Sequence, residues 1–434
     1  MGKVSRFMQK SVTKPTERMW HGVRTGMMAA AVTAVGLVVV PKLLAQTGMS
    51  FPGAFFSAGF IALAGTFLMG WLRLPFLLSI PVSCSSSLVF LSAISQGLSW
   101  QQLLGIGAAA SLAGVILFQG AAGRCMTSWI PQPIRQVMPG ALGLMLILLG
   151  LYMGRILVRS PWSLTMLGNF QDPLAWFSAA GIFVTLALMA VGRSSAIMYG
   201  MVLTAAVSLA EGFWAVPAAP FLLPEGLDHT AFQLCLTAET PREAVEMLSA
   251  GVTLLMVLSC VNWSWLQAIQ PEEREGRRVL PWIFGLGIPG ALLGSLPVAV
   301  APPTALLLTE REQCRTAAFS TAFFLMLALF CEPLLAAMAE FPAMVVPVLV
   351  GGGLMMIRTM NRAALSAFAE WPDVSASVAV LVLMPLSWSI SAGLGIGMIL
   401  WCVMKICAGR LRDVPRGTMA LSFLFAVYFL YVSV

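Results

Sequence analysis

Hydrophobic residues fill most of this chain in runs of about 20, and short polar stretches separate the runs. Runs of this length cross the hydrocarbon core of a bilayer as helices. The pattern predicts an all-α polytopic membrane protein with about 14 transmembrane segments. The predicted segments are 25–45, 51–70, 75–93, 101–122, 134–154, 174–191, 195–211, 245–268, 280–295, 297–309, 316–338, 342–357, 374–389 and 391–408.

A polar, acidic stretch in the middle of the chain divides these segments into two sets of seven. An odd number of segments turns the second set upside down relative to the first, so the sequence predicts two inverted repeats. The letters GLM recur in the fifth and twelfth segments, at 143–145 and 353–355. A last apolar segment, 417–433, is short for a span, so it either crosses the membrane or lies flat at its surface. The predicted units are a basic tail (1–24), the first repeat (25–212), an acidic outer linker (213–244), the second repeat (245–409) and a C-terminal apolar segment (410–434).

Proline and small polar residues interrupt two of the predicted segments. The first interruption, 80–90, reads IPVSCSSSLVF, and the second, 296–308, reads LPVAVAPPTALLL. A lipid-facing helix does not tolerate such breaks, but a helix that ends against a protein-lined or water-filled cavity does. In transporters built from repeats, the broken segments of the two halves point to the solute site. The pattern therefore predicts that segments 3 and 10 are broken and lie face to face.

Composition and charge agree with a membrane protein of fixed orientation. The chain has 434 residues, 59% of them hydrophobic and 10% charged, whereas soluble domains carry about 25% charged residues. With the N-terminus inside, 21 of the 25 lysines and arginines fall in the tail or in inner loops. This bias follows the positive-inside rule and predicts a multi-pass protein of the cytoplasmic (inner) membrane with a cytoplasmic N-terminus. The net charge of +7 then reflects topology and predicts no nucleic-acid partner.

Polar side chains in the apolar runs are the candidates for solute binding. Ser83, Ser85 and Ser86 offer hydroxyls at the first break, but they equally well satisfy the backbone of a broken helix. An amide in an apolar span is costly unless it is paired or used, so Asn262 either binds a solute or joins two helices. Trp263 either stacks on a planar solute or anchors the helix at the membrane interface.

The sequence contains no pattern typical of an enzyme, a metal site or a cofactor site. No cysteine pair has CxxC spacing, and both histidines lie outside the apolar runs. No carboxylate falls at a predicted mid-membrane position, although intramembrane acids usually carry proton or sodium coupling. We therefore expect neither catalysis nor a cofactor.

Four stretches of the chain carry a resemblance to a known family. They are MSFPGAFFSAGFIALAGTFLMGWLRLPFLLSIP, GLSWQQLLGIGAAASLAGVILF, VMPGALGLMLILLGLYMGRILVRSPWSLTMLGNF and VLVLMPLSWSISAGLGIGMILWCVMKICAGR. In these stretches the chain resembles the AzgA-like purine permeases, a branch of the nucleobase–cation symporters. The resemblance implies fourteen segments in two inverted repeats, a core domain that moves against a gate domain, and proton-coupled uptake of adenine, guanine or hypoxanthine. It also allows a homodimer.

The chain departs from the family pattern where the solute and the coupling ion would bind. The resemblance puts Ser86 where the family has asparagine, and Val261 or Asn262 where the eighth segment of the family has an acid. In the tenth segment it leaves Thr304 without the glutamate that follows in the family. The missing acids predict altered or absent proton coupling, so the coupling ion is either H⁺ or none.

Three hypotheses follow for the function. The first is a permease for purine nucleobases or a similar small planar solute, which works by alternating access and binds the solute with Ser83, Ser85, Ser86, Asn262, Trp263 and Thr304. The second is a membrane scaffold or sensor that keeps the frame without transport. The third is a permease for another small solute such as an anion, bound by the positive ends of broken helices.

Overall fold

The computed structural model describes most of the chain. The described residues are 15–74, 76–81, 85, 98–119, 129–193, 195–223, 226–238, 240–269, 273–301, 314–360, 368 and 370–432.

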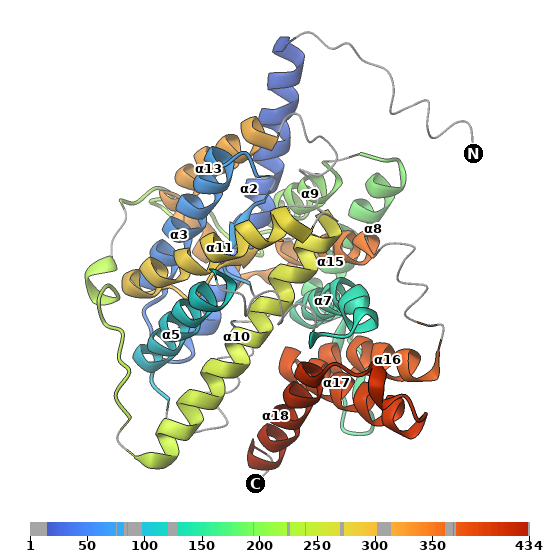
Figure 1. Ribbon diagram of the computed structural model, residues 1–434. Helices are drawn as coiled ribbons and strands as arrows, with labels where there is room; N and C mark the ends of the chain where they lie inside the picture. Colours follow the sequence, from blue (N-terminus) through green and yellow to red (C-terminus); the bar gives the residue numbers. More distant parts are fainter. Residues whose placement is uncertain are drawn as a thin grey trace.

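Helices account for almost all of the described secondary structure (Figure 1). The first half contains α2 (Pro15–Ala45), α3 (Phe51–Trp71), α5 (Trp100–Gln119), α7 (Gln132–Met153), α8 (Pro173–Ala190) and α9 (Ala196–Ala210). The second half contains α10 (Pro241–Ile269), α11 (Glu273–Leu293), α13 (Cys314–Leu329), α14 (Glu332–Glu340), α15 (Val346–Thr359), α16 (Trp371–Ser387), α17 (Ile390–Cys407) and α18 (Arg416–Val432). Three short 3₁₀ helices are η1 (Leu227–His229), η3 (Pro342–Met344) and η5 (Leu411–Asp413).

Two small antiparallel sheets complete the fold. Strand β1 (Leu78–Ser79) pairs with β4 (Ala299–Val300), although 219 residues of chain and many helices separate them in the sequence. Strands β2 (Leu157–Arg159) and β3 (Thr165–Leu167) form a hairpin between α7 and α8. Strand β4 lies inside the second predicted interruption, and β1 ends immediately before the first.

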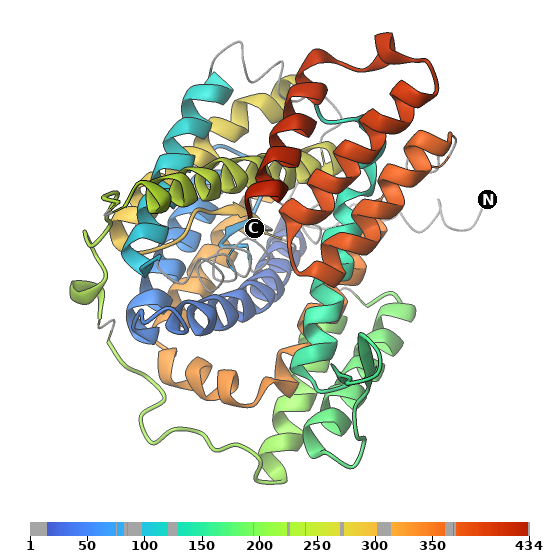
Figure 2. The same cartoon turned by 90° about the horizontal axis from the view of Figure 1, so that it is seen from below.

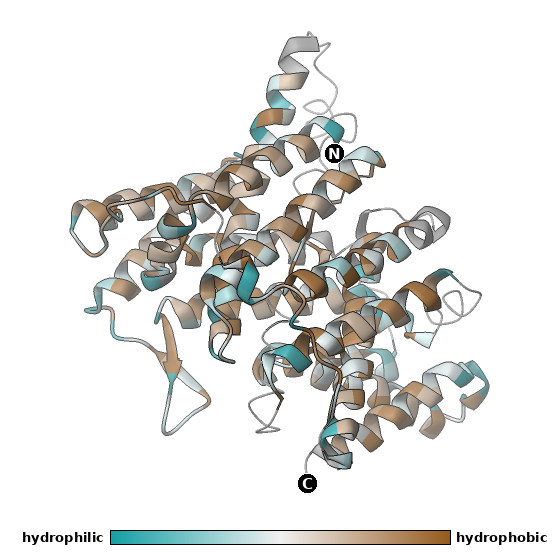
Figure 3. Ribbon diagram, turned by 90° about the vertical axis from the view of Figure 1, so that its left-hand side faces the viewer, coloured by the Kyte–Doolittle hydropathy of each residue, from teal (hydrophilic) through white to brown (hydrophobic). Residues whose placement is uncertain are grey.

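The helices have the length and apolar character of membrane spans. Within the described residues, seven helices can cross a membrane, or eight if the bent pair α13–α14 counts as one span. Hydrophobic residues run along the helices, and hydrophilic residues gather at helix ends and in loops (Figure 3). The protein is therefore an all-α multi-pass membrane protein, and the count of fourteen segments stays a prediction.

The predicted span 316–338 is wrong as a single straight helix. Helix α13 ends at Leu329, and α14 begins at Glu332 after a bend of 86°. Pro333 explains the break, because its ring would clash with the carbonyl of Leu329 and because it has no N–H to continue the helix. The predicted straight span took no account of this proline inside the apolar run.

The helices pack in two groups, and each group takes helices from both halves of the chain (Figures 1 and 2). In the first helix group, α13 packs on α2 and α3, and α5 packs on α10 and α11. In the second helix group, α7 packs on α15 and α16, α8 packs on α9 and α15, and α16 packs on α17. Helix α18 lies against α17 at the edge of the second group.

Glycine lets the helices of the second group approach closely. A Cβ atom at Gly143 of α7 would lie 2.5 Å from the carbonyl oxygen of Gly353 of α15, and a Cβ atom at Gly353 would lie 2.5 Å from that of Gly143. No side chain fits at either position without a shift of the backbone. The two GLM sequences therefore meet each other across the α7–α15 contact.

Candidate functional site

The chain that leads into the first interruption meets the second interruption at the β1–β4 pair, which we call the strand crossing. Leu78 lies opposite Val300, and Ser79 lies opposite Ala299. The N–H of Ala301 donates to the carbonyl oxygen of Leu77 at 2.8 Å and extends the pairing by one bond. The residues just before the first predicted interruption therefore pair with the second, while the face-to-face arrangement of 80–90 itself stays a prediction.

Proline explains why the chain is extended at the strand crossing. Ile80 precedes Pro81, Leu296 precedes Pro297, and Ala301 precedes Pro302. A residue before proline avoids the helical region, because the proline ring clashes with its backbone. The local sequence therefore forces short extended pieces into what would otherwise be apolar helices.

A threonine of α3 holds β1 in place. The hydroxyl of Thr66 donates to the carbonyl oxygen of Leu78 and accepts from the N–H of Leu78, both at 3.3 Å. Thr66 is fully buried. Backbone groups outside helices need such partners inside a membrane protein, because no bulk water can pair with them. Sequence analysis missed Thr66, since a single threonine in an apolar helix usually bonds its own helix.

An asparagine of α10 holds β4 in the same way. The Oδ1 atom of Asn262 accepts from the N–H of Val300 at 2.9 Å, and Asn262 is fully buried. The amide therefore joins a helix to a strand and does not join two helices. Asn262, a candidate that the sequence predicts in the eighth segment, therefore contacts the second interruption.

Two buried N–H donors, on Asn262 and on the next residue of α10, have no partner among the described residues. Neither Nδ2 of Asn262 nor Nε1 of Trp263 makes a hydrogen bond in the part of the chain that the structure describes. Trp263 is 3% exposed and lies in the main hydrophobic core, so it is not an anchor at the membrane interface. More than nine in ten buried polar groups are paired in folded proteins. Each of these donors therefore lacks an acceptor in the described part of the chain, and the Asn262 donor lies next to β4.

The serines of the first interruption are only partly described. Ser85 is buried, and its hydroxyl donates to the carbonyl oxygen of Pro81 at 3.0 Å. This bond favours the interpretation that Ser85 satisfies the broken backbone. Ser83, Ser86 and Thr304 lie outside the described residues.

Apolar side chains surround the strand crossing. Leu78, Ile80, Val298 and Val300 are all buried members of the same hydrophobic core as Trp263. An apolar environment strengthens each hydrogen bond inside it and raises the free energy of each unpaired polar group. The crossing can therefore bind a polar, planar molecule tightly only if that molecule supplies the missing acceptors.

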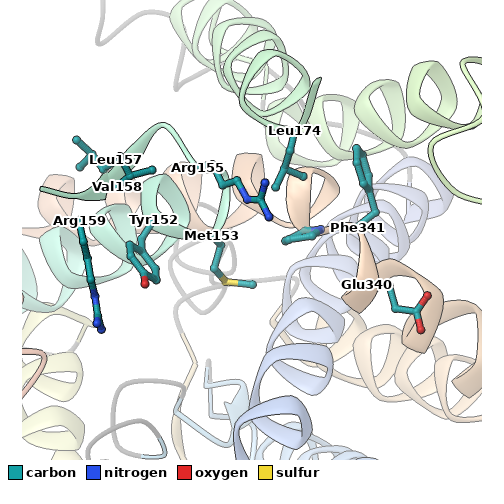
Figure 4. Close-up of a pocket in the computed structure, with 10 residues that line it drawn as sticks. Tyr152, Met153, Arg155, Leu157, Val158, Arg159, Leu174, Glu340 and Phe341 are labelled. Atoms are coloured by element: carbon teal, nitrogen blue, oxygen red, sulfur yellow. The ribbon is translucent and has the colours of Figure 1, made fainter. Parts of the chain in front are cut away.

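A cavity lies at the β2–β3 hairpin, and we call it the hairpin pocket (Figure 4). It has a volume of about 670 Å³, which is within the range of small-molecule sites. Helices α7, α8 and α14, strand β2 and 3₁₀ helix η3 contribute its walls. The lining residues are Tyr152, Met153, Arg155, Leu157, Val158, Arg159, Leu174, Glu340, Phe341 and Pro342.

The polar groups of the hairpin pocket do not require a ligand. Arg155 donates to Asp172 at 2.9 Å, and this hydrogen bond holds the pKa of Asp172 below its ordinary value. Arg159 and Glu340 are exposed, so water can pair with them. The pocket shares no residue with the strand crossing, which remains the stronger candidate site.

Several known permeases are similar in sequence to this chain over most of its length. Adenine permease AdeP of Escherichia coli is 23% identical over 442 residues, which cover 95% of this chain and 94% of the relative. Guanine/hypoxanthine permease PbuG of Bacillus subtilis is 24% identical over 395 residues, which cover 88% of each chain. Adenine permease AdeQ of Escherichia coli is 25% identical over 448 residues, which cover 95% of each chain. The resemblance to purine permeases is confirmed. No family model matches the chain.

The fold matches that of solved membrane transporters. The transmembrane domain of the cyanobacterial bicarbonate transporter BicA superposes with a TM-score of 0.56 at 16% identity, over 86% of this chain and 97% of the transporter domain. The murine anion transporter SLC26A9 superposes with a TM-score of 0.56 at 11% identity, over 93% of this chain and 70% of that chain. At this level of identity, the likeness shows the fold and says nothing of the solute.

Proposed function

We propose that this chain is a membrane permease that carries purine nucleobases by alternating access. Relatives that match 88–95% of this chain are permeases for adenine or for guanine and hypoxanthine, and transport proteins share the fold. Permeases move solutes without chemical conversion, so the proposal includes no catalytic step. The solute binds at the strand crossing.

The orphan amide of Asn262 is the observation that carries this proposal. Its Nδ2 atom is bonded to the same carbon as the Oδ1 atom that accepts from Val300, so it lies beside the second interruption. Purine rings carry several acceptor atoms on their edges, and such an atom would supply the missing partner. The indole of Trp263 adds a second unpaired donor on the next residue.

The helix packing supports fourteen segments in two inverted repeats, with 25–212 and 245–409 as the repeats. In this layout α2, α3 and α5 correspond to α10, α11 and α13. The packing of α13 on α2 and α3 then matches the packing of α5 on α10 and α11. Likewise, α8 on α15 and α9 matches α16 on α7 and α17.

Elements that lie on the axis between two repeats must contact their own counterparts. The β1–β4 pair and the α7–α15 pair have this property. The reciprocal contact of Gly143 and Gly353 is what a local two-fold axis requires, because each residue then meets its equivalent. In this layout, the axis passes through the strand crossing, where repeat-built transporters hold their solute.

Alternating access then takes place between the two helix groups. Both strands of the crossing and both of their side-chain supports, Thr66 and Asn262, lie in or beside helices of the first group. At one contact between the groups, Val39 and Leu43 of α2 meet Met153 of α7 and Val348 of α15. Such apolar contacts have no fixed hydrogen-bond geometry, so they permit one group to slide along the other.

The orientation and coupling that we propose follow from the charge pattern. The protein lies in the cytoplasmic membrane with its N-terminus inside, because 21 of its 25 lysines and arginines then fall on the inner side. Asn262 cannot exchange a proton at physiological pH. The proposal is therefore transport with weak or absent proton coupling at the strand crossing.

A ligand screen on detergent-purified protein tests the proposed function. A ligand at 100 times its dissociation constant stabilises the folded protein by about 2.7 kcal/mol, which raises its melting temperature. We expect purine bases to raise the melting temperature, and we expect the shift to disappear in Asn262→Ala. Ser208→Ala is the matched control, since Ser208 is a buried hydroxyl of α9 in the other helix group.

Two other results would overturn the proposal. Stabilisation by bicarbonate or chloride alone would favour the anion hypothesis, because unpaired N–H donors also suit an anion. No stabilisation by any purine or anion would favour the scaffold or sensor hypothesis.

A further inference from the structure

We propose that the hairpin pocket binds the head group of an acidic phospholipid, with Arg159 and Tyr152 at the phosphate. This lipid site is separate from the strand crossing, and it does not depend on the solute that the permease carries. Three features of the molecule support it: the level of the pocket in the membrane, the exposed apolar residues around it, and the chemistry of its lining.

The hairpin pocket lies where two membrane-spanning helices end. Helices α7 and α8 both have the length and apolar character of spans. The last two residues of α7, Tyr152 and Met153, line the pocket together with Leu174 in the first turn of α8. Helix α7 has 22 residues, so it is about 33 Å long, close to the thickness of the hydrocarbon core of a bilayer. Its end, and the pocket with it, therefore lies at the level of the lipid head groups.

Helix α8 turns one side toward lipid beside the pocket. Only 33% of its apolar window is buried, the lowest share among the seven spans of the described residues. Trp176 and Phe183 are exposed and lie two turns apart on one side of the helix. Trp176 is in the first turn, and tryptophan is enriched at the boundary between hydrocarbon and water. Lipid therefore reaches the end of α8 at which the pocket lies.

The turn of the β2–β3 hairpin is ordered and presents large apolar side chains. The hydroxyl oxygen of Ser160 accepts from the N–H groups of Trp162 and Ser163, both at 3.1 Å. The hydroxyl of Ser163 donates to the carbonyl oxygen of Thr165 at 2.8 Å. Nevertheless, Trp162 is 93% exposed and Leu164 is 81% exposed. Insertion of these two side chains among lipids removes their apolar surface from water, which favours a hairpin that lies in the head-group layer.

One side of the hairpin pocket offers donors for a phosphate. Arg155 is held by Asp172 at 2.9 Å, whereas Arg159 is exposed and can turn to a ligand. The polar ends of Arg159 and Tyr152 point the same way in Figure 4. The ring of Tyr152 makes an edge contact with Trp388, with 6.1 Å between the ring centroids, which restricts where its hydroxyl lies. A guanidinium and a phenol hydroxyl both donate to phosphate oxygens.

The rest of the pocket fits the apolar part of a lipid. Met153, Leu174 and Phe341 line it, and a free phosphate ion would leave them uncovered. A phospholipid covers them with the start of its acyl chains. The carboxylate of Glu340 lies on the side of the pocket opposite Arg159, so an acidic head group is attracted to the Arg159 side (Figure 4).

Photo-crosslinking on the full chain in nanodiscs tests the proposal. The variant Trp162→p-benzoylphenylalanine puts a photoreactive aromatic side chain on the hairpin turn. The nanodiscs contain phosphatidylglycerol and phosphatidylcholine in equal amounts with identical acyl chains, and mass spectrometry identifies the adducts. We expect phospholipid adducts with phosphatidylglycerol favoured by about fivefold, which is the attraction of one arginine to an anionic lipid.

Combined variants locate the preference. Arg159→Ala should lower the ratio of the two lipid adducts to about one, and Tyr152→Phe, which keeps the ring, should lower it in part. Arg193→Ala is the matched control, because Arg193 is an exposed arginine beyond the opposite end of α8. This control should keep the fivefold ratio.

Each other outcome overturns the proposal. A turn that gives no lipid adduct projects into water, and a turn that crosslinks to a second copy of the chain is a protein contact. A fivefold ratio that survives in Arg159→Ala means that the pocket does not hold the head group. If the photoreactive residue at Trp162 prevents folding, the same residue at Leu164 takes its place. Purine binding is measured separately, so a failure of the lipid site leaves the proposed permease intact.

Discussion

The strand crossing and the hairpin pocket differ in how their polar groups are satisfied. The hairpin pocket is lined by exposed Arg159 and Glu340, and its Arg155 is paired with Asp172. At the crossing, every polar group that the structure describes is buried, and the Asn262 amide and the Trp263 indole each keep an N–H without a partner. An exposed charge can form hydrogen bonds with water. A buried unpaired donor cannot, so it destabilises the fold unless a ligand supplies an acceptor. Cavity volume would favour the hairpin pocket, whereas the unpaired buried donors favour the strand crossing, which is the site that we propose.

The largest expected effect comes from removing the amide at the crossing. Asn262→Leu keeps a side chain of similar size but leaves the N–H of Val300 without an acceptor. We expect purine binding to vanish and the free energy of unfolding to fall by about 1–3 kcal/mol. Uptake into proteoliposomes and thermal melts measure the two effects, with Ser208→Ala as control. Normal uptake by Asn262→Leu would remove the strand crossing from consideration.

A smaller effect is expected at the other strand. Thr66→Val keeps the shape of the side chain and removes the hydroxyl that bonds both backbone groups of Leu78. Because Thr66 supports β1 and does not itself offer a free donor, we expect solute affinity to fall by about tenfold, equivalent to about 1.4 kcal/mol. Thr66→Ser retains the hydroxyl and should bind nearly as well as the unaltered protein. A ligand titration of the three proteins compares them directly. Equal affinity in Thr66→Val would show that β1 does not need this support.

The ion pair beside the hairpin pocket should affect stability weakly and only above acidic pH. The hydrogen bond from Arg155 lowers the pKa of Asp172 from its ordinary value of 3.8. The stabilisation is therefore fully present above that ordinary value and disappears as the pH falls through the lower folded-state pKa. Asp172→Asn keeps a capping side chain at the start of α8 but removes the charge. We expect it to melt slightly below the unaltered protein at pH 7, by less than about 1 kcal/mol because Arg155 is exposed.

Melts from pH 7 down to pH 3 check this prediction. The difference between Asp172→Asn and the unaltered protein should shrink below the ordinary pKa. A difference that grows as the pH falls would contradict it.

The smallest effect is expected from the exposed charges of the hairpin pocket. Arg159→Ala and Glu340→Gln change side chains that are exposed to solvent. Surface substitutions of this kind usually change stability by less than about 0.5 kcal/mol. We expect purine binding and uptake within about twofold of the unaltered protein. A loss of uptake in either variant would make the hairpin pocket part of the transport path.

Local sequence was enough for the helices and for their breaks. Apolar runs become helices because a membrane protein must satisfy its backbone within each segment, and prolines end them where their rings clash with the preceding turn. The same rule, applied to Pro333, would have found the bend between α13 and α14. An asparagine in an apolar run can also be recognised from the sequence, since its amide must be hydrogen-bonded within the protein or to a ligand.

The sequence by itself determined the class of protein, the positions of the breaks and the candidate Asn262, because these depend on residues close together in the chain. Only the tertiary structure decided what Asn262 contacts. Its partner Val300 lies 38 residues away, and many other backbone groups could have accepted or donated in its place. The role of Thr66 and the pairing of β1 with β4 were likewise decided by packing. The local sequence around a hydroxyl or an extended dipeptide does not indicate which distant group it will bond. The free donor of Asn262 follows from its pairing with Val300, so it could be inferred only from the folded chain.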